Sequence, residues 1–315
     1  MTKNILITGG SGFIGSNFLS YALGQGDNSK SNDFSSKKLQ HRIIAPNHEE
    51  LDILNVAQLS NIFKDISPET VINFAGHRDA NSAELQRGDM QGSAWKTNVK
   101  GVKNLSKICQ EYGIFLIHIS TDMVFSGRED NMGPYSEEDK IETDLKNLSW
   151  YGWTKAEAER ILADNKNAAI IRIGNVTQPI YDPKLDYVGK ILYLFDHGEL
   201  YPLFHDQHLT LTYVPSVLEA IEVLVVNKKP GIFHIASKNI FTPYKLSEYL
   251  IKKARGKTNV LRSISIKEYL KKLPNRYPRY GGLLAKKTSK QLQIKLFDWE
   301  RIVDFYIEKV NSPFH

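Results

Sequence analysis

The stretch Asn4-Ile-Leu-Ile-Thr-Gly-Gly-Ser-Gly-Phe-Ile-Gly-Ser16 decides the fold of this chain. Its apolar run over 5–8 predicts a short strand, and the apolar spacing over 13–22 is typical of a helix. The glycines between them, at positions 9, 12 and 15, predict a tight turn. Such glycines let the backbone approach a dinucleotide pyrophosphate, whose charge the free amides of a helix N-terminus attract. On its own the triplet is equally typical of an ordinary strand-to-helix turn.

Strands and helices alternate from this turn to about residue 175, which predicts an α/β fold with a doubly wound parallel sheet. The predicted strands span 5–8, 42–45, 71–76, 114–120 and 169–173, and the predicted helices span 13–22, 56–66, 93–112 and 150–165. The polar segment 24–40 is expected to be an excursion between the first helix and the second strand.

Beyond residue 175 the pattern becomes irregular. Helices are expected at 188–195, at 215–226, from 243 onward and at 298–310, and a strand is expected at 231–236. We therefore predict a dinucleotide-binding Rossmann domain over 1–175 and a smaller substrate-binding α/β region over 176–315. Strands near 170–173 and 231–236 are expected to join or adjoin the main sheet.

The bulk composition is that of an ordinary globular protein. Of 315 residues, 41% are hydrophobic and 24% are charged, and no apolar run approaches the roughly 20 residues that span a bilayer. The absence of a basic-then-apolar leader and the single cysteine, Cys109, favour a cytoplasmic protein without internal disulfides. The net charge of +6 comes from scattered side chains, so we expect no nucleic-acid or membrane partner, whereas an anionic small substrate would suit this surface.

Polar side chains that could take part in catalysis occur at three places after the glycine turn. Ser120-Thr-Asp122 follows a predicted strand, at the carboxyl end where doubly wound sheets bind ligands. Tyr151 and Lys155 are four residues apart at the start of a predicted helix and share one face, and Asn98 lies in the preceding helix. A Tyr–Lys pair at this spacing is common on helix surfaces, so its weight comes from the glycine turn and the Ser-Thr-Asp segment.

Together these residues predict hydride transfer at a carbonyl group. The developing alkoxide needs a proton donor, and tyrosine can donate although its reference pKa is about 10. Because a cation within about 4–6 Å lowers that pKa, we expect Lys155 to lower the pKa of Tyr151 while it holds the ribose hydroxyls of a cofactor. Thr121 is expected to orient the carbonyl, and Asn98 to bind a water or backbone group that relays protons.

With these motifs the chain resembles the extended short-chain dehydrogenases/reductases, and within them the dTDP-4-dehydrorhamnose reductases and their relatives. The matching features are Thr8-Gly-Gly-Ser-Gly-Phe-Ile-Gly15, Glu50-Leu-Asp-Ile53, Val71-Ile-Asn-Phe-Ala75, Ala83-Glu84, Asn98-Val99, Ser120-Thr-Asp-Met-Val-Phe125, Tyr151-Gly-Trp-Thr-Lys155, Ile171-Arg-Ile173, Asp206-Gln207 and Gly231-Ile-Phe-His-Ile-Ala236. The glycine turn and the Thr-Tyr-Lys set are specific to the superfamily, and the other pieces indicate the subfamily less firmly.

The resemblance implies roles for individual residues. The implied catalytic residues are Thr121, Tyr151, Lys155 and Asn98. The implied cofactor contacts are Gly9, Gly12, Phe13, Ile14, Gly15, Asp52, Ile53, Ala75, Gly76, His77 and Lys155, and the implied substrate contacts are Met123, Val124, Asn175, Asp206 and Gln207. A homodimer is also consistent with the resemblance, through residues such as Trp95, Val99, Val102 and Tyr112.

The chain departs from the family pattern around the implied substrate pocket. His77-Arg78 stands where the family usually has Tyr-Thr, and residues 86–93 look inserted. The segment Pro278-Arg-Tyr-Gly-Gly282 follows the family's substrate segment only loosely. These differences leave the sugar and its nucleotide open, but not the fold.

The cofactor and the reaction type follow from two further positions. Ala45-Pro-Asn47 ends the second strand without the acid by which NAD-specific folds hold the adenosine ribose, which predicts NADP(H), with NAD(H) as the alternative. Met123 stands where the similar sugar-nucleotide dehydratases carry a second acid, which predicts plain reduction of a 4-keto nucleotide deoxysugar. A 4-epimerase stays open, and so does a non-catalytic NADP-binding regulator such as the regulatory subunit of methionine adenosyltransferase.

Two other features are assigned structural roles. His205 and His208 flank Asp206, but the sequence shows no clustered third ligand, so we expect a pocket-lining loop and no metal site. Cys109 lies in the apolar register of its helix, which predicts a place in the core or a dimer interface and not a nucleophile.

Overall fold

The computed structural model describes residues 3–22, 24, 41–179, 186–273 and 276–310 of the chain. The predicted polar excursion over 24–40 therefore lies outside the described residues, apart from Gly24. The chain forms two compact units, each assembled from three stretches. The first unit comprises 1–124, 149–172 and 218–233, and the second unit comprises 125–148, 173–217 and 234–315.

The first unit is built on a six-stranded sheet of the order β2-β1-β3-β4-β5-β9. Its strands are β1 (Lys3–Thr8), β2 (His41–Ile44), β3 (Thr70–Asn73), β4 (Phe115–Thr121), β5 (Ala168–Ile173) and β9 (Gly231–His234). The pairs β1–β2, β1–β3 and β3–β4 are parallel, with Ile5 opposite Ile43 and Thr70. Because β2 and β3 flank β1 on opposite sides, the chain reverses direction of winding at β1, which is where sheets of this kind bind ligands.

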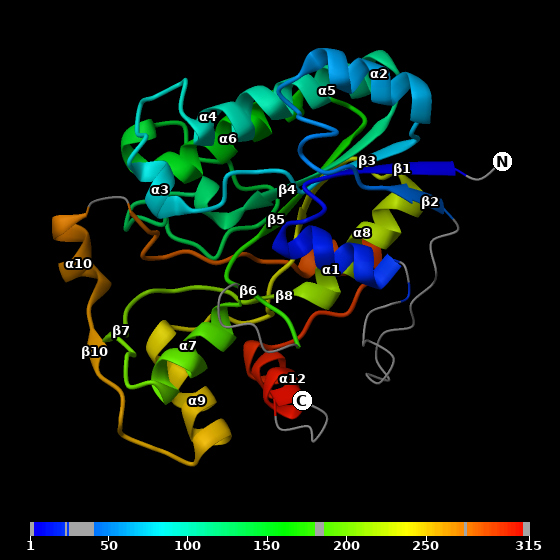
Figure 1. Ribbon diagram of the computed structural model, residues 1–315. Helices are drawn as coiled ribbons and strands as arrows, with labels where there is room; N and C mark the ends of the chain where they lie inside the picture. The colour runs from blue at the N-terminus through cyan, green and yellow to red at the C-terminus, as the bar shows by residue number, and fades with distance from the viewer. Residues whose placement is uncertain (1–2, 23, 25–40, 180–185, 274–275, 311–315) are drawn as a thin grey trace. The chain divides into compact units, whose positions relative to one another are not determined.

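Helices cover both faces of this sheet (Figure 1). One face carries α2 (Val56–Ile66), α5 (Val102–Glu111) and α6 (Trp150–Ala163), and the other carries α1 (Phe13–Ala22) and α8 (Val214–Asn227). The α/β class and the doubly wound sheet predicted from the sequence are thus confirmed.

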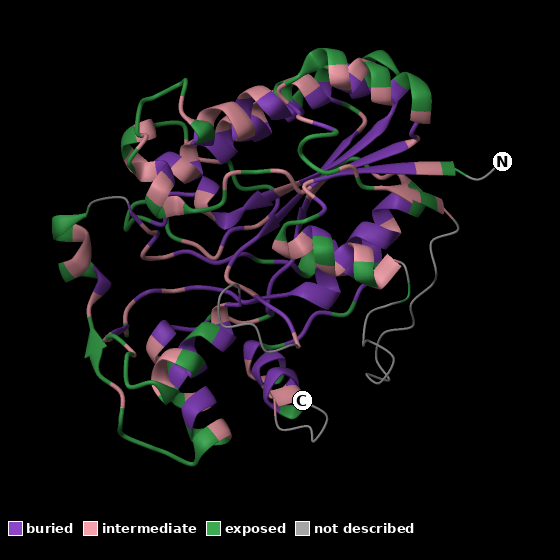
Figure 2. Ribbon diagram, viewed as in Figure 1, coloured by how far each residue is buried: buried purple, intermediate pink, exposed green. Residues whose placement is uncertain are grey.

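A hydrophobic core fills the space between the sheet and the face that carries α2, α5 and α6. Leu6, Val71 and Leu116 enter it from the strands, and Leu59 and Leu105 enter it from the helices. Figure 2 shows that the inner strands of this sheet are largely buried, whereas the edge strand β2 has no buried residue. Burial of this apolar surface at roughly 25 cal/mol per Å² is the main stabilising term.

The long helix predicted over 93–112 is interrupted. It comprises α4 (Ser93–Trp95), a π-helical segment η2 (Lys96–Gly101) and α5. A side chain at Gly101 would overlap Ile53, so the helix passes very close to the loop before α2. Wide turns of this kind occur mostly at functional sites, and this one contains the buried side chain of Asn98.

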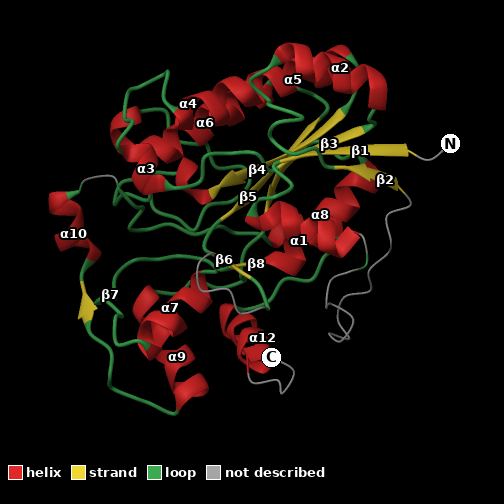
Figure 3. Ribbon diagram, viewed as in Figure 1, coloured by secondary structure: helices red, strands yellow, loops and turns green. Residues whose placement is uncertain are grey.

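The second unit holds three longer helices, α7 (Tyr187–Asp196), α9 (Pro243–Arg255) and α12 (Trp299–Val310). Thr242 caps α9 and accepts from the Lys245 amide, as the Thr-Pro pair predicts. Figure 3 shows that loops join these elements over much of the unit. The sequence did not predict several short elements of the structure: α3 (Ala80–Glu84), η3 (Asp122–Val124), η4 (Leu145–Asn147), β6 (Val176–Thr177), β7 (Leu203–Phe204), β8 (Thr212–Tyr213), β10 (Ser263–Ile264), α10 (Ile266–Lys272) and α11 (Lys286–Leu292).

Two single-residue expectations are settled by this architecture. Cys109 and Val102 lie in the core of the first unit, so they are core residues and not interface residues. Among the described helices, none has both the length and the apolar character that a membrane crossing requires.

Candidate active site

The glycine turn after β1 has the shape that a close backbone approach requires. Gly9 has a φ of 69°, and a Cβ there would overlap the backbone of Ala75 in the loop after β3. A Cβ on Gly15 would overlap the carbonyl oxygen of Gly9, and the Gly12 amide donates to that oxygen over 3.0 Å. The turn is therefore held against β3 and leads directly into α1.

A pocket of about 250 Å³ opens at the carboxyl ends of β1, β2 and β3. It is lined by Thr8, Gly9, Gly10, Ser11, Pro46, Asn47, His48, Leu51, Asp52, Ile53, Leu54, Ala75, Ser93, Lys96 and Thr97. All of these residues belong to the first unit. Backbone from a glycine turn, a mostly apolar floor and a few polar groups are what a nucleotide site needs.

Four of the residues predicted to contact a cofactor line this pocket: Gly9, Asp52, Ile53 and Ala75. Gly12, Phe13, Ile14 and Gly15 belong to the turn and the start of α1, and Gly76 and His77 follow the pocket-lining Ala75. His48 and Lys96 also line the pocket, and the sequence motifs did not predict them. The position of His48, a basic residue shortly after the second strand, is the signal that could have identified it.

The start of α6 is fixed by three contacts. Ser149 caps the helix and accepts from the Gly152 amide over 3.1 Å, and the Trp150 amide donates to Glu84 over 2.7 Å. A Cβ on Gly152 would overlap the carbonyl oxygen of Met123 in η3. The first turn of α6, which carries Tyr151, is thereby pressed against the segment that follows Thr121.

This packing places Thr121 beside Tyr151. Burial raises the pKa of Tyr151 to about 12; the Thr121 hydroxyl opposes this shift, and Asp122 adds to it. The Thr121 hydroxyl itself donates to the Asp122 carboxylate over 3.2 Å and accepts from the Met123 amide over 3.3 Å. Burial also raises the pKa of Asp122 to about 6. Tyr151 is therefore protonated at neutral pH and is available as a proton donor.

Lys155 does not act on Tyr151 as the sequence analysis expected. Its Nζ donates to the carbonyl oxygen of Ile119 over 2.6 Å and lies 3.1 Å from Nε2 of His118. The groups that set the pKa of Tyr151 are its own burial, Thr121 and Asp122. The prediction that Lys155 lowers this pKa is wrong for this structure, because the amine is directed to β4.

Asn98 holds backbone in place. Its Oδ1 accepts from the His77 amide over 2.8 Å, and its Nδ2 donates to the His77 carbonyl over 3.0 Å and to Thr154 over 2.9 Å. These bonds tie η2 to the loop after β3 and to α6. Of the two roles predicted for Asn98, the structure shows the contact with a backbone group.

The residues predicted to contact substrate lie in both units. Met123 and Val124 form η3 in the first unit, and the Val124 side chain is fully buried. In the second unit, Asn175 donates to Thr210 and Gln207 donates to the Pro278 carbonyl. Their roles toward substrate stay predictions.

Asp206 is engaged within the second unit as well. Its carboxylate accepts from Ser265 and the Ile266 amide, at the start of α10, and lies 3.3 Å from Arg279. These partners hold the pKa of Asp206 below its usual range, although burial opposes them. Within the described residues, no group of three acids, histidines or cysteines has the geometry of a metal site.

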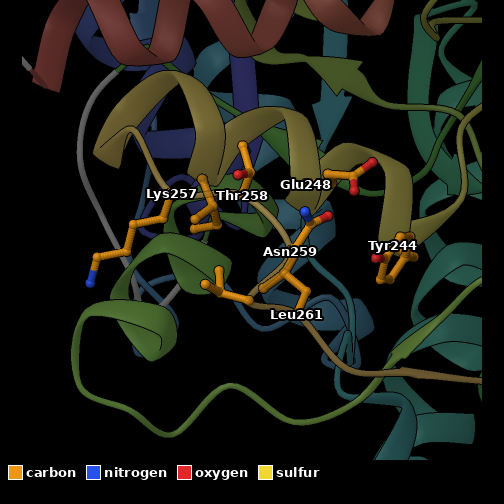
Figure 4. Close-up of a pocket in the computed structure, with 8 residues that line it drawn as sticks. Tyr244, Glu248, Lys257, Thr258, Asn259 and Leu261 are labelled. Carbon is orange, nitrogen blue, oxygen red and sulfur yellow. The ribbon is translucent and has the colours of Figure 1, made fainter.

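A second concavity lies between α9 and the segment that follows it (Figure 4). Tyr244, Glu248, Lys257, Asn259 and Leu261 are among the residues that line it. It encloses no space in which even a water molecule would fit. We therefore take the pocket at the sheet edge, together with Thr121, Tyr151 and Lys155, as the candidate active site.

Comparison with known proteins supports the assignment of the fold and shows the family. A family model described as the RmlD substrate binding domain matches residues 3–312. The chain is 27% identical over 308 residues to a dTDP-4-dehydrorhamnose reductase of Aggregatibacter actinomycetemcomitans, an alignment that covers 94% of this chain and 96% of that protein. It is also 30% identical over 173 residues to methionine adenosyltransferase 2 subunit beta of Bos taurus, covering 54% of this chain and 46% of that protein.

The fold is shared with a solved structure. The dTDP-4-dehydrorhamnose reductase from Bacillus anthracis str. Ames, solved in complex with NADP, superposes with a TM-score of 0.79. The superposition covers 98% of this chain and 100% of that one at 22% sequence identity. At this identity the likeness concerns the fold.

Proposed function

The chain belongs to the RmlD substrate-binding domain family of extended short-chain dehydrogenases/reductases, and we propose that it reduces the 4-keto group of a nucleotide-activated deoxysugar with NADPH. The observation that carries this proposal is the pairing of Thr121 with Tyr151. Burial keeps Tyr151 protonated, and the Thr121 hydroxyl lies near enough, at the carboxyl end of β4, to act on the pKa of Tyr151. A protonated tyrosine beside a second hydroxyl suits a carbonyl oxygen that gains negative charge.

The first unit fits a dinucleotide on two counts. The Gly9 and Gly15 positions admit no Cβ, so only glycine allows this tight turn at the start of a helix, where backbone amides can bind phosphate. The pocket at the ends of β1 to β3 measures about 250 Å³, slightly less than the roughly 300–1,000 Å³ of most ligand pockets, so we expect it to take only part of a dinucleotide. When bound, the nicotinamide would supply the hydride.

The side chains of the chain supply the proton and the orientation. Tyr151 donates its phenolic proton to the carbonyl oxygen as the carbon accepts the hydride, and Thr121 hydrogen-bonds the same oxygen. Lys155 holds the cofactor ribose when its side chain turns from β4. We keep Met123, Val124, Asn175, Asp206 and Gln207 as proposed substrate contacts on the strength of the sequence alone.

NADP(H) is the proposed cofactor. In the first unit, Asn47 and His48 line the pocket just after β2, at the place where NAD-specific folds carry an acid toward the adenosine ribose. The Asn47 side chain is uncharged, and the pocket also contains Lys96. The acid that lines the pocket, Asp52, lies further along the chain and accepts from the Leu54 amide over 2.9 Å. The lack of an acid directly after β2 favours NADP(H) over NAD(H).

Two alternatives differ in what they predict. A 4-epimerase would return the hydride to the sugar and consume no NADPH. A regulator like methionine adenosyltransferase 2 subunit beta, to which the chain is similar over about half its length, would bind the cofactor without turnover. The protonated Tyr151 beside Thr121 favours an enzyme over the regulator. An epimerase would use the same tyrosine, so the reductase is preferred to it only because the family match is to reductases.

The test is a screen of NADPH oxidation by the purified chain against a panel of 4-keto-6-deoxy nucleotide sugars. We expect one equivalent of NADPH consumed per sugar and a 4-hydroxyl product. Tyr151→Phe is the matched control, because it removes only the hydroxyl. Conversion of a 4-hydroxy nucleotide hexose to its 4-epimer without added reductant would instead identify an epimerase, and cofactor binding without any turnover would favour the regulator.

A further inference from the structure

His118 lies at the centre of a buried line of hydrogen bonds in the first unit. It belongs to β4 and is fully buried. Its Nε2 lies 3.1 Å from Nζ of Lys155, and its Nδ1 lies 3.0 Å from Nδ2 of Asn73 in β3. Since each of these contacts needs one donor and one acceptor, the positions of the protons can be worked out from the partners.

The orientation of Asn73 is set by a backbone donor. Its Oδ1 accepts from the Ala75 amide over 3.1 Å and from the Thr8 hydroxyl over 2.6 Å. A backbone amide can only donate, so the oxygen of Asn73 must face Ala75. The Nδ2 group of Asn73 therefore faces His118 and donates to its Nδ1.

The tautomer of His118 follows from this orientation. Nδ1 accepts from Asn73, so it carries no proton, and the ring is neutral with its proton on Nε2. Burial holds the pKa of His118 well below its usual range, and a protonated Lys155 would lower it further, so the ring is neutral in either form of Lys155. The Nε2–H group then points at the nitrogen of Lys155.

Lys155 can accept that bond only as an amine. An ammonium nitrogen has three donors and no lone pair, whereas a neutral amine has one lone pair and can still donate to the Ile119 carbonyl. Burial lowers the pKa of Lys155 to about 8, so the neutral form is within reach near neutral pH. The hydrogen-bond geometry and the burial of Lys155 thus both favour its neutral amine.

The charged groups around Lys155 do not change this assignment. Glu159, one turn further along α6, raises the pKa of Lys155. Its carboxylate is already paired with Arg172 over 2.6 Å and accepts from Ser120 over 2.5 Å. On the side of η3, the pKa values of Asp122 and Tyr151 are both raised mainly by burial of these side chains.

We propose that His118 is a positioning residue, which holds the unprotonated amine of Lys155 against β4 and releases the side chain when the amine takes up a proton. The proposal rests on the proposed function for its purpose, since the released ammonium is the form that holds a cofactor ribose. The position of the proton on His118 does not depend on that function.

The first test reads the tautomer in the unmodified chain. The protein contains nine histidines, so the protein is labelled with ¹⁵N-histidine and the His118 signals are identified by their loss in His118→Gln. Above the midpoint of the Lys155 titration we expect a protonated Nε2 and an unprotonated Nδ1. The Nε2 signal should shift with the same midpoint as Lys155. The proposal would be overturned by a proton on Nδ1, or by a His118 signal that does not change as Lys155 titrates.

The second test reverses the tautomer. In Asn73→Asp the carboxylate still accepts from Ala75 but must also accept from Nδ1–H, so Nε2 becomes an acceptor and stabilises the ammonium. We expect the His118 proton to move to Nδ1 and the acid dissociation constant of Lys155, read in ¹³C-lysine-labelled protein, to fall at least about tenfold. Asn61→Asp on the exposed side of α2, which adds the same charge outside this line of hydrogen bonds, is the control and should leave both unchanged.

The outcomes separate this proposal from the proposed function. If the proton moves to Nδ1 while the titration of Lys155 stays where it was, the coupling is absent and the proposal fails. If Asn73→Asp does not fold, the tautomer of the unmodified chain still decides. Failure of every sugar in the NADPH panel would count against the reductase assignment and leave the nuclear magnetic resonance result intact.

Discussion

Gly152 in the first turn of α6 lies so close to the Met123 carbonyl oxygen that a Cβ would overlap it. The contact sets the distance between η3 and the turn of α6 that bears Tyr151. Since Thr121 immediately precedes η3, the close approach of Thr121 to Tyr151 depends on this glycine.

Gly152→Ala should therefore destabilise the protein and lower turnover. An Ala for Gly exchange inside a helix is normally stabilising by about 0.5–1 kcal/mol, whereas overlap in a packed site costs about 1–3 kcal/mol. We expect the cost of the overlap to exceed the gain from the better helix former. Urea unfolding and NADPH oxidation together measure it, and a variant more stable than the parent with full turnover would show that η3 and α6 are not tightly coupled.

Tyr151→Phe should reduce turnover by on the order of 10²–10⁴, the usual contribution of a positioned general acid. The aromatic ring remains, so the affinity for NADP⁺ should hardly change. Steady-state kinetics and equilibrium binding give the two quantities. Near-normal turnover would remove Tyr151 from the proton-donating role.

The sequence predicted the elements that depend on local pattern. The helix over 56–66 has the predicted bounds, as does the helix over 13–22, because apolar periodicity and the Asn55 cap are local signals. β9 lies at the edge of the main sheet beside β5, as the pattern around 231–236 suggested.

The sequence did not predict features that depend on partners distant in the chain. The π-helical turn around Asn98 follows from its bonds to His77 and Thr154. The direction of Lys155 depends on His118, 37 residues away in sequence, which looked like any other strand residue. The sequence also did not predict that each unit is assembled from three separate stretches of the chain. No local signal marks residues 125–148 as part of the second unit.

Asn47→Asp should shift the cofactor preference toward NADH. Oδ1 of Asn47 accepts from the Glu49 and Glu50 amides, and a carboxylate can make both bonds, so the local turn is preserved. The new charge lies at the pocket and should weaken NADPH binding relative to NADH by about tenfold, or ~1.4 kcal/mol. Dissociation constants for both cofactors measure the ratio, with Asn61→Asp on the exposed side of α2 as the control. An unchanged ratio would place the 2′-phosphate away from Asn47.

Affinity for NADP⁺ should fall as the pH rises through about 8. Burial lowers the pKa of Lys155 from 10.5 to about 8, so the ammonium that holds the ribose is present below this pH and lost above it. The dissociation constant measured across this range should show the transition. Lys155→Met should bind weakly at every pH and lack it, and an identical transition in that variant would assign the effect to another group.

Glu159→Gln should destabilise the first unit strongly. Glu159 and Arg172 are almost fully buried and paired over 2.6 Å, and loss of one partner from such a pair costs about 3–5 kcal/mol. Glu157→Gln on the same helix removes the partly exposed pair with Arg160 and should cost less than about 1 kcal/mol. Urea unfolding compares the two; equal effects would show that the buried pair contributes no more than the surface pair.

The most direct test of the proposed function is the fate of the hydride. NADPH carrying deuterium at the transferred position is incubated with the purified chain and a 4-keto-6-deoxy nucleotide sugar that the panel identifies as a substrate. The proposal predicts a product with deuterium at C4 and a hydroxyl on that carbon, formed in equal amount to the NADP⁺ released. A product without deuterium at C4, or conversion of the sugar without oxidation of NADPH, would contradict it.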